Sequence, residues 1–409
     1  MIRKLLIGIL PALLAACATQ SPTVSEKPQP DVTPAKVAQL IWQPLAWSAF
    51  AEWQGFDLSA GGQALRTSCK AMARKPGWRD ACEGLASVAV NDDAALRQYL
   101  RQYFRPYRLI SGDGSESGLV TGYYEPMLQG SRKRSQRAAY PVYAVPDDLL
   151  VVELAELYPE LKGMRLRGRL EGRKVVPYCS RADIDSGKAA FSGKVLAWVE
   201  DPVELFFLQI QGSGRVRLPD GSFLRVGYAD QNGHPYKAIG KVLIERGELP
   251  ANKVSMQSIQ GWARDNPARL QELLNANPSY VFFRELPAGT DGPPGAQGLP
   301  LTPGGSIAVD PKQLPLGTPV LLATTQPGNG APLNRLVVAQ DTGGAIRGPL
   351  RADFFWGYGA DAGKLAGAMK QTGRMWVLWP VGSNQRLRRK WPVAALGFDE
   401  IFTRIKVDC

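Results

Sequence analysis

Histidine is almost absent from this sequence, because His234 is the only one in 409 residues. No Cys-x-x-Cys pair occurs either, so the chain lacks the ligand patterns that usually hold zinc. We therefore expect no metal site and no cofactor. His234 itself lies in an Asn-Gly-His-Pro turn, where a histidine is most often simply solvated.

Acidic residues are also few relative to basic ones. The sequence has 37 Asp and Glu against 49 Lys and Arg, a formal charge of +12. The basic residues form scattered runs such as Arg132–Arg134 and Arg386–Lys390, without the base-reading aromatic residues of a nucleic-acid module. We expect no nucleic acid as a partner. The excess of positive charge favours an acidic polymer or an anionic membrane face.

Long apolar runs are missing apart from one at the N-terminus, over residues 5–16. A run of this length is too short to span a membrane as a mature helix. Arg3 and Lys4 precede it, and this order of charges and apolar residues is typical of a secretory signal. We therefore interpret residues 1–16 as a signal peptide.

The end of this signal, Leu-Ala-Ala-Cys, resembles the bacterial lipobox, in which the cysteine becomes the lipidated first residue of the mature chain. The resemblance implies that Cys17 carries an acyl anchor; an ordinary cleaved signal with an incidental cysteine is the alternative. Ala18 stands where an aspartate would retain a lipoprotein in the inner membrane, so we expect anchoring in outer-membrane lipid, on the periplasmic face. Residues 17–36, rich in Pro, Ser and Thr, predict a flexible tether behind the lipidated cysteine.

The other four cysteines form an even set in an oxidising compartment, where disulfides are expected. They are Cys69, Cys82, Cys179 and Cys409. Three pairings are compatible with four cysteines. The short spacing favours a bridge between Cys69 and Cys82, which leaves Cys179 and Cys409 as the second pair.

The chain length predicts two domains, and 44% hydrophobic with 21% charged residues is ordinary for a folded protein. Apolar residues at helical spacing predict helices over residues 40–53, 57–75, 78–103, 238–246 and 256–275. Alternating patterns predict strands within residues 119–130, 140–146, 194–229, 306–311, 316–324, 334–341, 352–358 and 373–380. The Gly- and Pro-rich residues 288–305 predict a long loop or a crossing between lobes.

Two aspartates, Asp341 and Asp353, each lie at the polar end of a strand-like segment. A pair of carboxyl groups at this spacing suits acid and base chemistry on a glycosidic or peptide bond. Between them, Gly343 and Gly344 permit a tight turn or a close approach of ligand to backbone. The aromatic residues after Asp353 are positioned to desolvate it and raise its pKa. The alternative is that both aspartates form turns and the aromatic residues fill a barrel.

Polar and aromatic residues upstream are candidates for substrate contacts. Tyr123 and Tyr124 are neighbours on a predicted strand, so their rings point to opposite faces and only one faces a ligand. Gln211 and Ser213 precede and enter a glycine-rich turn, where amide and hydroxyl groups line a groove. In each case a structural role is the alternative.

Several of these segments together resemble a known family. VDPKQLPLGT, AQDTGGAIRG and RADFFWG look like the three-aspartate domain of peptidoglycan-cleaving enzymes, with Asp310, Asp341 and Asp353 as its aspartates. Upstream, TGYYEPMLQGSR, LQIQGSGRV, VGYADQNGHPYKAIGKVLIERGEL and NPSYVFF resemble successive blocks of the membrane-bound lytic murein transglycosylase A family. The blocks follow in order from about residue 85 to 380.

The resemblance implies a mainly β fold with helices (α+β). Residues 37–122 and 286–409 would form a double-psi β-barrel lobe with N-terminal helices. Residues 123–285 would form an inserted second β-barrel lobe, and the glycan would lie in the groove between the two.

The resemblance also implies a reaction, in which the β-1,4 bond between N-acetylmuramic acid and N-acetylglucosamine is cleaved without water to leave a 1,6-anhydromuramic acid end. Asp353 matches the family's catalytic acid, and Asp341 matches the neighbour that orients or tunes it. Asp310, in a Val-Asp-Pro turn, is interpreted as structural. Further glycan contacts are assigned to Tyr123, Tyr124, Gln211, Ser213, Gly343, Gly344 and Arg347.

Three other functions remain as alternatives. An aspartic protease uses two Asp-Thr-Gly loops, and this chain has one, at residues 341–343. A hydrolase using both aspartates would leave a reducing end. A non-catalytic peptidoglycan-binding lipoprotein would leave no product at all. The sequence leaves open endo or exo cleavage, dependence on peptide stems, and a cell-wall synthase or scaffold protein as a further partner.

Overall fold

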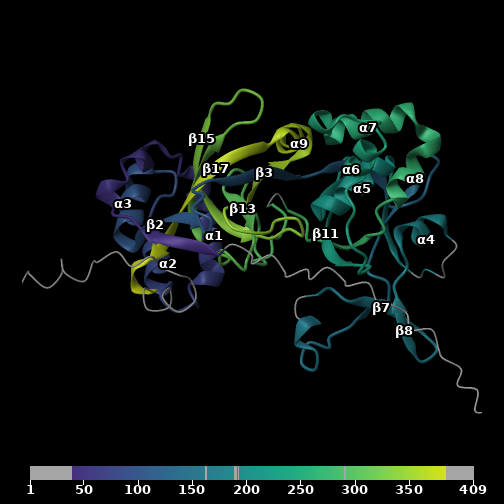
Figure 1. The fold of residues 1–409 in the computed structure, drawn as a ribbon, viewed down its shortest axis with the longest axis horizontal. Helices are drawn as coiled ribbons and strands as arrows, with labels where there is room; N and C mark the ends of the chain where they lie inside the picture. The colour runs from purple at the N-terminus through teal and green to yellow at the C-terminus, as the bar shows by residue number, and fades with distance from the viewer. Residues whose placement is uncertain (1–38, 162–163, 188–190, 192, 290–291, 384–409) are drawn as a thin grey trace, which may run out of the picture. The chain divides into compact units, whose positions relative to one another are not determined.

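A computed structural model describes residues 39–161, 164–187, 191, 193–289 and 292–383 (Figure 1). The predicted signal peptide, Cys17 and its tether, and Cys409 lie outside these residues. The main sheet has eight strands in the order β1-β2-β17-β14-β15-β13-β16-β3. They are β1 Leu40–Pro44, β2 Phe104–Ser111, β3 Gly118–Glu125, β13 Ser306–Val309, β14 Pro319–Thr325, β15 Pro332–Asp341, β16 Ala352–Tyr358 and β17 Lys370–Pro380.

This sheet closes on itself, because β17 pairs with β3 as well as with β2 and β14. Six strands, β17-β14-β15-β13-β16-β3, therefore form a ring in which every strand has two neighbours. Closure removes the free edges that an open sheet presents to other chains. It also places β3 directly beside β16, although more than two hundred residues separate them in sequence.

The interior of the ring is filled by alternate residues of its strands. On β16, Ala352 and Phe354 are fully buried, and they share one core with Val120 of β3 and with Ile307 and Val309 of β13. Because side chains on a strand alternate between two faces, the residues between these point away from the core. Asp353 and Ala308 are among them. The strands predicted over residues 306–380 are confirmed.

Three helices pack beside the ring: α1 Ser59–Met72, α2 Arg79–Ala86 and α3 Asp93–Tyr103. The helix predicted over residues 57–75 is confirmed. The one predicted over 78–103 is in fact two helices, and Asp92 begins the second by accepting a hydrogen bond from the backbone N–H of Ala95. α1 approaches β15 so closely that a Cβ on Gly61 would lie 2.2 Å from the carbonyl oxygen of Leu336.

A helix predicted over residues 40–53 was wrong. The segment forms β1, paired antiparallel with β2, followed by two short 3-10 helices, Trp47–Ala49 and Ala51–Gly55. Leu40 and Trp42 are buried while Ile41 and Gln43 are half-buried, which is the two-residue period of a strand. Pairing with β2 outweighs the helical spacing of the apolar residues.

A second sheet has six strands in the order β12-β11-β10-β4-β9-β5. They are β4 Met127–Ser131, β5 Tyr140–Tyr143, β9 Val195–Val199, β10 Ser213–Arg217, β11 Phe223–Gln231 and β12 Val281–Glu285. β10 and β11 form a hairpin, since they pair antiparallel across a turn in which Gly221 has φ 84°. An isolated bridge between Ala144 and Phe283 joins the chain after β5 to β12.

Five helices accompany this sheet: α4 Arg181–Ser186, α5 Pro202–Gln211, α6 Ile239–Glu245, α7 Met256–Asp265 and α8 Leu270–Asn275. The helices predicted over residues 238–246 and 256–275 are confirmed, the second as two helices separated by a 3-10 turn at Pro267–Arg269. The strand expected through residues 202–211 was wrong, because these residues form α5. Asp201 caps its first turn, Pro202 occupies the first helical position, and Gly212 ends it in the left-handed conformation.

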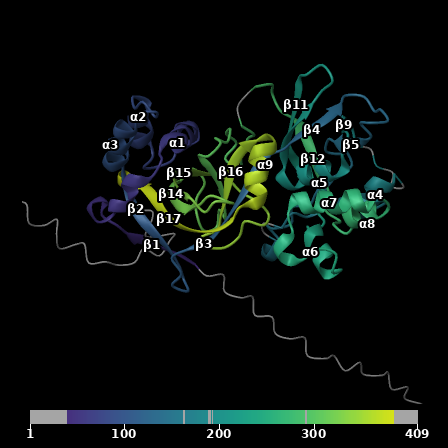
Figure 2. The ribbon, with the colours of Figure 1, turned by 90° about the horizontal axis from the view of Figure 1, so that it is seen from above.

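A small third sheet contains β6 Leu150–Val151, β7 Arg167–Glu171 and β8 Lys174–Pro177. Helix α9, Gly359–Ala368, follows β16 and contacts β3 (Figures 1 and 2). Short 3-10 helices also occur at Pro159–Leu161, Ala251–Lys253, Pro267–Arg269 and Val381–Ser383. The described helices are all too short or too polar to cross a membrane. The fold is thus α+β and dominated by sheets.

Candidate active site

Asp341 and Asp353 lie on either side of one residue, Ala308 of β13. Ala308 pairs with Asp341 on the parallel strand β15 and with Asp353 on the antiparallel strand β16. Strands are roughly 4.8 Å apart, so the two aspartate Cα atoms are about 10 Å apart. The residue between them is an alanine, so only a methyl group stands between the two aspartates on β13.

A bulge in β15 brings Asp341 onto this face. Ile307 pairs with Ala339, but the next residue, Ala308, pairs with Asp341, so that Gln340 is the extra residue of β15. In a regular strand Asp341 would point to the same side as Ala339, which is buried in the core. The bulge reverses this direction, so that Asp341 points to the same face of the sheet as Asp353.

Asp353 accepts a short hydrogen bond from β3. The two residues Thr121 and Asp353 are paired across the parallel strands β3 and β16. Thr121 Oγ1 donates to Asp353 Oδ1 at 2.5 Å, and Arg351 Nη2 donates to the same Thr121 oxygen at 2.8 Å. Thr121 therefore connects a guanidinium group to the carboxyl group and fixes its direction.

Asp341 is held by three donors. Tyr123, two residues beyond Thr121 on the same face of β3, donates from its hydroxyl to Asp341 Oδ2 at 3.1 Å. The backbone N–H groups of Ala296 and Thr342 both donate to Oδ1 at 2.9 Å. This arrangement orients the carboxyl group and favours its ionised form.

Burial raises the pKa of Asp353 above its ordinary value, and the nearby Asp341 raises it further. The Thr121 hydrogen bond and the charge of Arg351 oppose this shift. Burial also raises the pKa of Asp341, against the hydrogen bonds from Thr342, Ala296 and Tyr123. Burial and both aspartates raise the pKa of Tyr123, so its hydroxyl remains a donor at neutral pH. A carboxyl group that holds its proton more tightly than usual suits a general acid.

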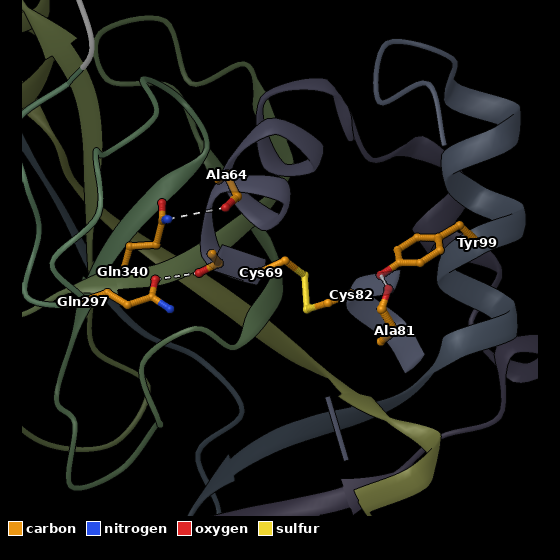
Figure 3. Close-up of a disulfide and its surroundings, with 8 residues drawn as sticks. Ala64, Cys69, Ala81, Cys82, Tyr99, Gln297 and Gln340 are labelled. Carbon is orange, nitrogen blue, oxygen red and sulfur yellow. Dashed lines mark hydrogen bonds between the residues drawn. A yellow bond between two sulfur atoms is a disulfide. The ribbon is translucent and has the colours of Figure 1, made fainter. Parts of the chain in front are cut away.

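The bulge at Gln340 is anchored to α1 (Figure 3). Gln340 Nε2 donates to the carbonyl of Ala64 at 3.4 Å, and its Oε1 accepts from Ser306 Oγ at 2.5 Å. Nearby, Ser68 of α1 donates to Gln297 Oε1, and the Gln297 backbone N–H donates to the carbonyl of Gln340. Gln297 directly follows Ala296, so α1 supports both sides of Asp341.

A disulfide between Cys69 and Cys82 joins α1 to α2, as predicted (Figure 3). The bond therefore links α1, the helix that anchors Gln340, to α2. In α2 the carbonyl oxygen of Ala81 accepts a hydrogen bond from the hydroxyl of Tyr99 in α3. Among the described residues Cys179 has no disulfide partner. Its predicted bond to Cys409 lies outside the described residues and stays a prediction.

Asp310 has a different environment from the other two aspartates. It is buried, and its carboxyl oxygens accept from the backbone N–H groups of Lys312 and Gly348. Gly348 belongs to the loop between β15 and β16, in which Leu350 has φ 50°, an unusual value for a residue with a side chain. Through these contacts Asp310 connects the turn after β13 to the loop before β16.

The structure brings only some of the other predicted residues to the aspartates. Gly343 and Gly344 follow Asp341 in the loop, and no atom lies within 4 Å of a Cβ built on Gly344. Arg347 is exposed, and its Nη1 donates to the carbonyl of Ile346. Tyr124 points to the opposite face of β3 from Tyr123, and its hydroxyl contacts Met256 Sδ at 3.3 Å.

Gln211 and Ser213 lie at the junction of α5 and β10. Gln211, at the end of α5, accepts from the backbone N–H of Tyr124 at 3.3 Å through Oε1, and Ser213 begins β10. Gln211 is thereby placed behind the strand that carries Tyr123. No contact in the described structure joins either residue to the aspartates.

Thr121 and Arg351 are functional candidates that the sequence analysis missed. A local signal for Thr121 was present, because it precedes Tyr123 by two positions and so shares its face on a strand. Its contact with Asp353 depends on the pairing of β3 with β16, which no local sequence pattern predicts.

Comparison with known proteins adds independent information. The family model described as "MltA specific insert domain" matches residues 119–284, and the "3D domain" matches residues 305–379. Membrane-bound lytic murein transglycosylase A of Escherichia coli K12 is 32% identical over 391 residues, which cover 92% of this chain and 95% of that protein. The protein of the same name from Vibrio cholerae serotype O1 is 34% identical, over 70% of this chain and 71% of its own length.

Solved structures are similar over most of the chain. MltA from Neisseria gonorrhoeae has 37% identity and a TM-score of 0.73, covering 83% of this chain and 91% of that one. The lytic transglycosylase LtgG of Burkholderia pseudomallei has 47% identity and a TM-score of 0.60, over 86% and 98%. E. coli MltA with bound chitohexaose has 28% identity and a TM-score of 0.62, over 84% and 95%.

Proposed function

Because the chain belongs to the membrane-bound lytic murein transglycosylase A family, we propose that it cleaves peptidoglycan as the family name describes. The bond cleaved is the β-1,4 link between N-acetylmuramic acid and N-acetylglucosamine. The reaction uses no water and leaves a 1,6-anhydromuramic acid end. The observation that carries this proposal is the pair of half-buried aspartates on one face, each held by its own donors.

Asp353 serves as acid and then as base. In the first step its proton passes to the glycosidic oxygen while the bond from that oxygen to muramic C1 breaks. In the second step the Asp353 carboxylate takes the proton of the muramic C6 hydroxyl while O6 bonds to C1 and closes the anhydro ring. The carboxyl group ends protonated, as it began, so one residue completes the cycle.

Asp341 supports both steps without covalent contact. Its negative charge would stabilise the carbon that becomes electron-poor when the glycosidic bond breaks. It also raises the pKa of Asp353, which favours the protonated form. Thr121 lowers the pKa of Asp353, because its hydrogen bond stabilises the carboxylate once it forms. The balance of these two neighbours lets one carboxyl group give up a proton and then recover one.

The same proposal extends to fold details and contacts. The closed six-stranded ring, whose strands lie within residues 118–125 and 306–380, is the candidate core of a double-psi barrel lobe. We assign residues 37–122 and 286–409 to that lobe and residues 123–285 to the inserted lobe, although β3 continues past this boundary to Glu125. Tyr123, which faces Asp341, is favoured over Tyr124 as a glycan contact. Gly343, Gly344 and Arg347 remain candidates because they lie in the loop after Asp341. Cys17 would hold the enzyme in outer-membrane lipid, on the periplasmic face.

Mass spectrometry of muropeptides released from purified sacculi tests this function. The wild-type protein should release anhydro-muropeptides, and Asp353→Asn should release about a thousandfold less, because loss of a general acid typically costs 10² to 10⁴ in rate. The exposed residue Asp80 of α2 offers a control, Asp80→Asn, that should retain activity. Reducing ends would indicate hydrolysis by both carboxyl groups, and no product from the wild type would favour a binding lipoprotein.

A further inference from the structure

A cavity of about 270 Å³ lies on the reverse side of β3 from the two aspartates. Tyr124 belongs to its wall, whereas its neighbour Tyr123 bonds to Asp341 on the opposite face. Four further elements contribute residues to the wall: β4, α5, α7 and α9. The mechanism proposed above uses no group in this cavity.

Besides the hydroxyl of Tyr124, the polar groups of the cavity are one carboxyl, two amides and one ammonium. Glu204 comes from α5, Gln257 and Gln260 from α7, and Lys364 from α9. The amide of Gln257 faces α9, since a Cβ on Gly367 would lie 3.5 Å from its oxygen. The remaining wall is apolar and flexible, with Met127, Met256 and Phe207 as its large side chains.

Glu204 differs from the other charged groups of this region in having no partner. Lys364 forms an ion pair with Asp361, and Tyr124 contacts Met256. No hydrogen bond or ion pair to the Glu204 side chain occurs within the described part of the chain. A half-buried carboxyl group without a partner is costly, because the loss of water is not compensated.

The charges around Glu204 are mainly of its own sign. Burial, with Asp201 and Glu200 beside it, raises the pKa of Glu204 to about 7. Burial, with Glu204 opposite, also raises the pKa of Tyr124 to about 12. α7 and β4 contribute uncharged residues to the wall, and α9 contributes only Lys364 at the rim. The cavity is therefore a site of negative potential enclosed by apolar and amide groups.

We propose that this cavity binds a short peptide through a primary ammonium group, with Glu204 as the partner of the ammonium and the Lys364 side near a peptide carboxylate. A volume of about 270 Å³ accommodates the end of an amino-acid side chain, and the thioether and aromatic side chains of the wall suit its methylene groups. Two sources share this chemistry: the peptide stem carried by the glycan substrate, and a free peptide. The first source rests on the proposed function, whereas the site itself does not.

Calorimetric titration of the full-length protein in detergent with a defined probe tests the site. The probe is N-acetyl-Ala-Glu-Lys with a free side-chain amine, and its Nε-acetylated form is the matched ligand control. At pH 8 the free amine should bind and the acetylated form should bind about tenfold more weakly or not at all, because a hydrogen bond to a charged group is lost. Equal binding of both probes, or no binding of either, overturns the proposal.

Variants locate the binding to the cavity. Glu204→Gln keeps the shape of the side chain and should weaken binding of the free-amine probe about tenfold at pH 8. Wild-type affinity should fall from pH 8 to pH 6, as Glu204 gains its proton, and the Glu204→Gln affinity should not change with pH. Glu83→Gln, at an exposed glutamate of α2, is the control and should bind as the wild type does. A Glu204→Gln protein with wild-type affinity overturns the assignment.

Competition with sacculi distinguishes the two sources. If the stem of the substrate fills the cavity, an excess of the free-amine probe slows the release of muropeptides, and the acetylated probe does not. If release is unaffected although the probe binds, the ligand is a free peptide. Absence of muropeptide release would contradict the proposed function alone, since the titration measures binding without turnover.

Discussion

Thr121 and Asp353 face each other across two parallel strands, with 2.5 Å between Thr121 Oγ1 and Asp353 Oδ1. The threonine hydroxyl also accepts from Arg351, so its own proton is directed at the carboxyl group. A single hydroxyl group thus influences how readily the proposed acid gives up its proton.

Thr121→Val should alter the pH profile of the reaction. The hydrogen bond lowers the pKa of Asp353, so its removal should raise that pKa. Activity of a general acid falls as pH rises through its pKa, and the falling limb of kcat should therefore move to higher pH. Muropeptide release from pH 4 to 9 measures this shift.

The control is Thr324→Val, which removes a buried hydroxyl that donates to the carbonyl of Thr372 and not to either aspartate. Its pH profile should match the wild type. If Thr121→Val lowers activity equally at every pH, Thr121 is only a packing residue.

Tyr123→Phe should lower kcat by about tenfold, because Asp341 loses one of its three donors and a hydrogen bond to a charged group is worth on the order of 1.5 kcal/mol. The ring remains, so stability should change little. Tyr140→Phe, at an exposed tyrosine of the second sheet, provides the comparison. Wild-type kcat for Tyr123→Phe would show that Asp341 needs only its two backbone donors.

Both aspartates should reduce the stability of the folded protein at neutral pH. Burial raises their pKa in the folded state above the ordinary value that they have when unfolded. The folded protein then binds more protons between these two values, so stability falls as pH rises through that window. Asp341→Asn and Asp353→Asn cannot ionise and should melt at higher temperature than the wild type at pH 8.

The same variants should lose this advantage at low pH. Below the ordinary carboxyl pKa of about 3.9, the wild-type aspartates are protonated in both states and resemble Asn. Thermal melts from pH 3 to pH 8 provide the comparison. An Asn variant less stable than the wild type at pH 8 would mean that the donors around the carboxylate outweigh its burial.

The Cys69–Cys82 disulfide should stabilise the protein by about 3 kcal/mol, as expected for a closed loop of this length. The double variant Cys69→Ala/Cys82→Ala should therefore have a lower melting temperature and a lower kcat, because α1 supports the Gln340 bulge. Cys179→Ala is the control. Unchanged kcat with a lowered melting temperature would separate the disulfide from the site.

Much of the site was predictable from short segments. Asp341 and Asp353 stand at the ends of apolar runs that form β15 and enter β16, and the strands of the last part of the chain follow the two-residue period. The residues that contact these aspartates were harder to predict. Thr121 reaches Asp353 only because β3 pairs with β16, and such long-range pairing leaves no local pattern.

The wrong predictions have local physical causes. Residues 202–211 alternate enough to resemble a strand, but Asp201, Pro202 and Gly212 together start and stop a helix. Residues 40–53 have helical spacing, but Leu40 and Trp42 are buried by pairing with β2. In the first segment the residues that start and stop a helix outweigh the spacing of the apolar residues. In the second segment tertiary contacts outweigh that spacing.

The extra residue in β15 couples the direction of Asp341 to the pairing register of the strand. If β15 kept all its residues but paired without the bulge, Asp341 would point to the same side as Ala339, toward the core. Deletion of Gln340 would instead pair Asp341 directly with Ala308 and leave it on the face that carries Asp353, but the contacts of Gln340 to Ala64 and Ser306 would be lost. Position 340 therefore ties the strand to α1, and the two losses, of register and of anchor, would arise from different changes at the same place.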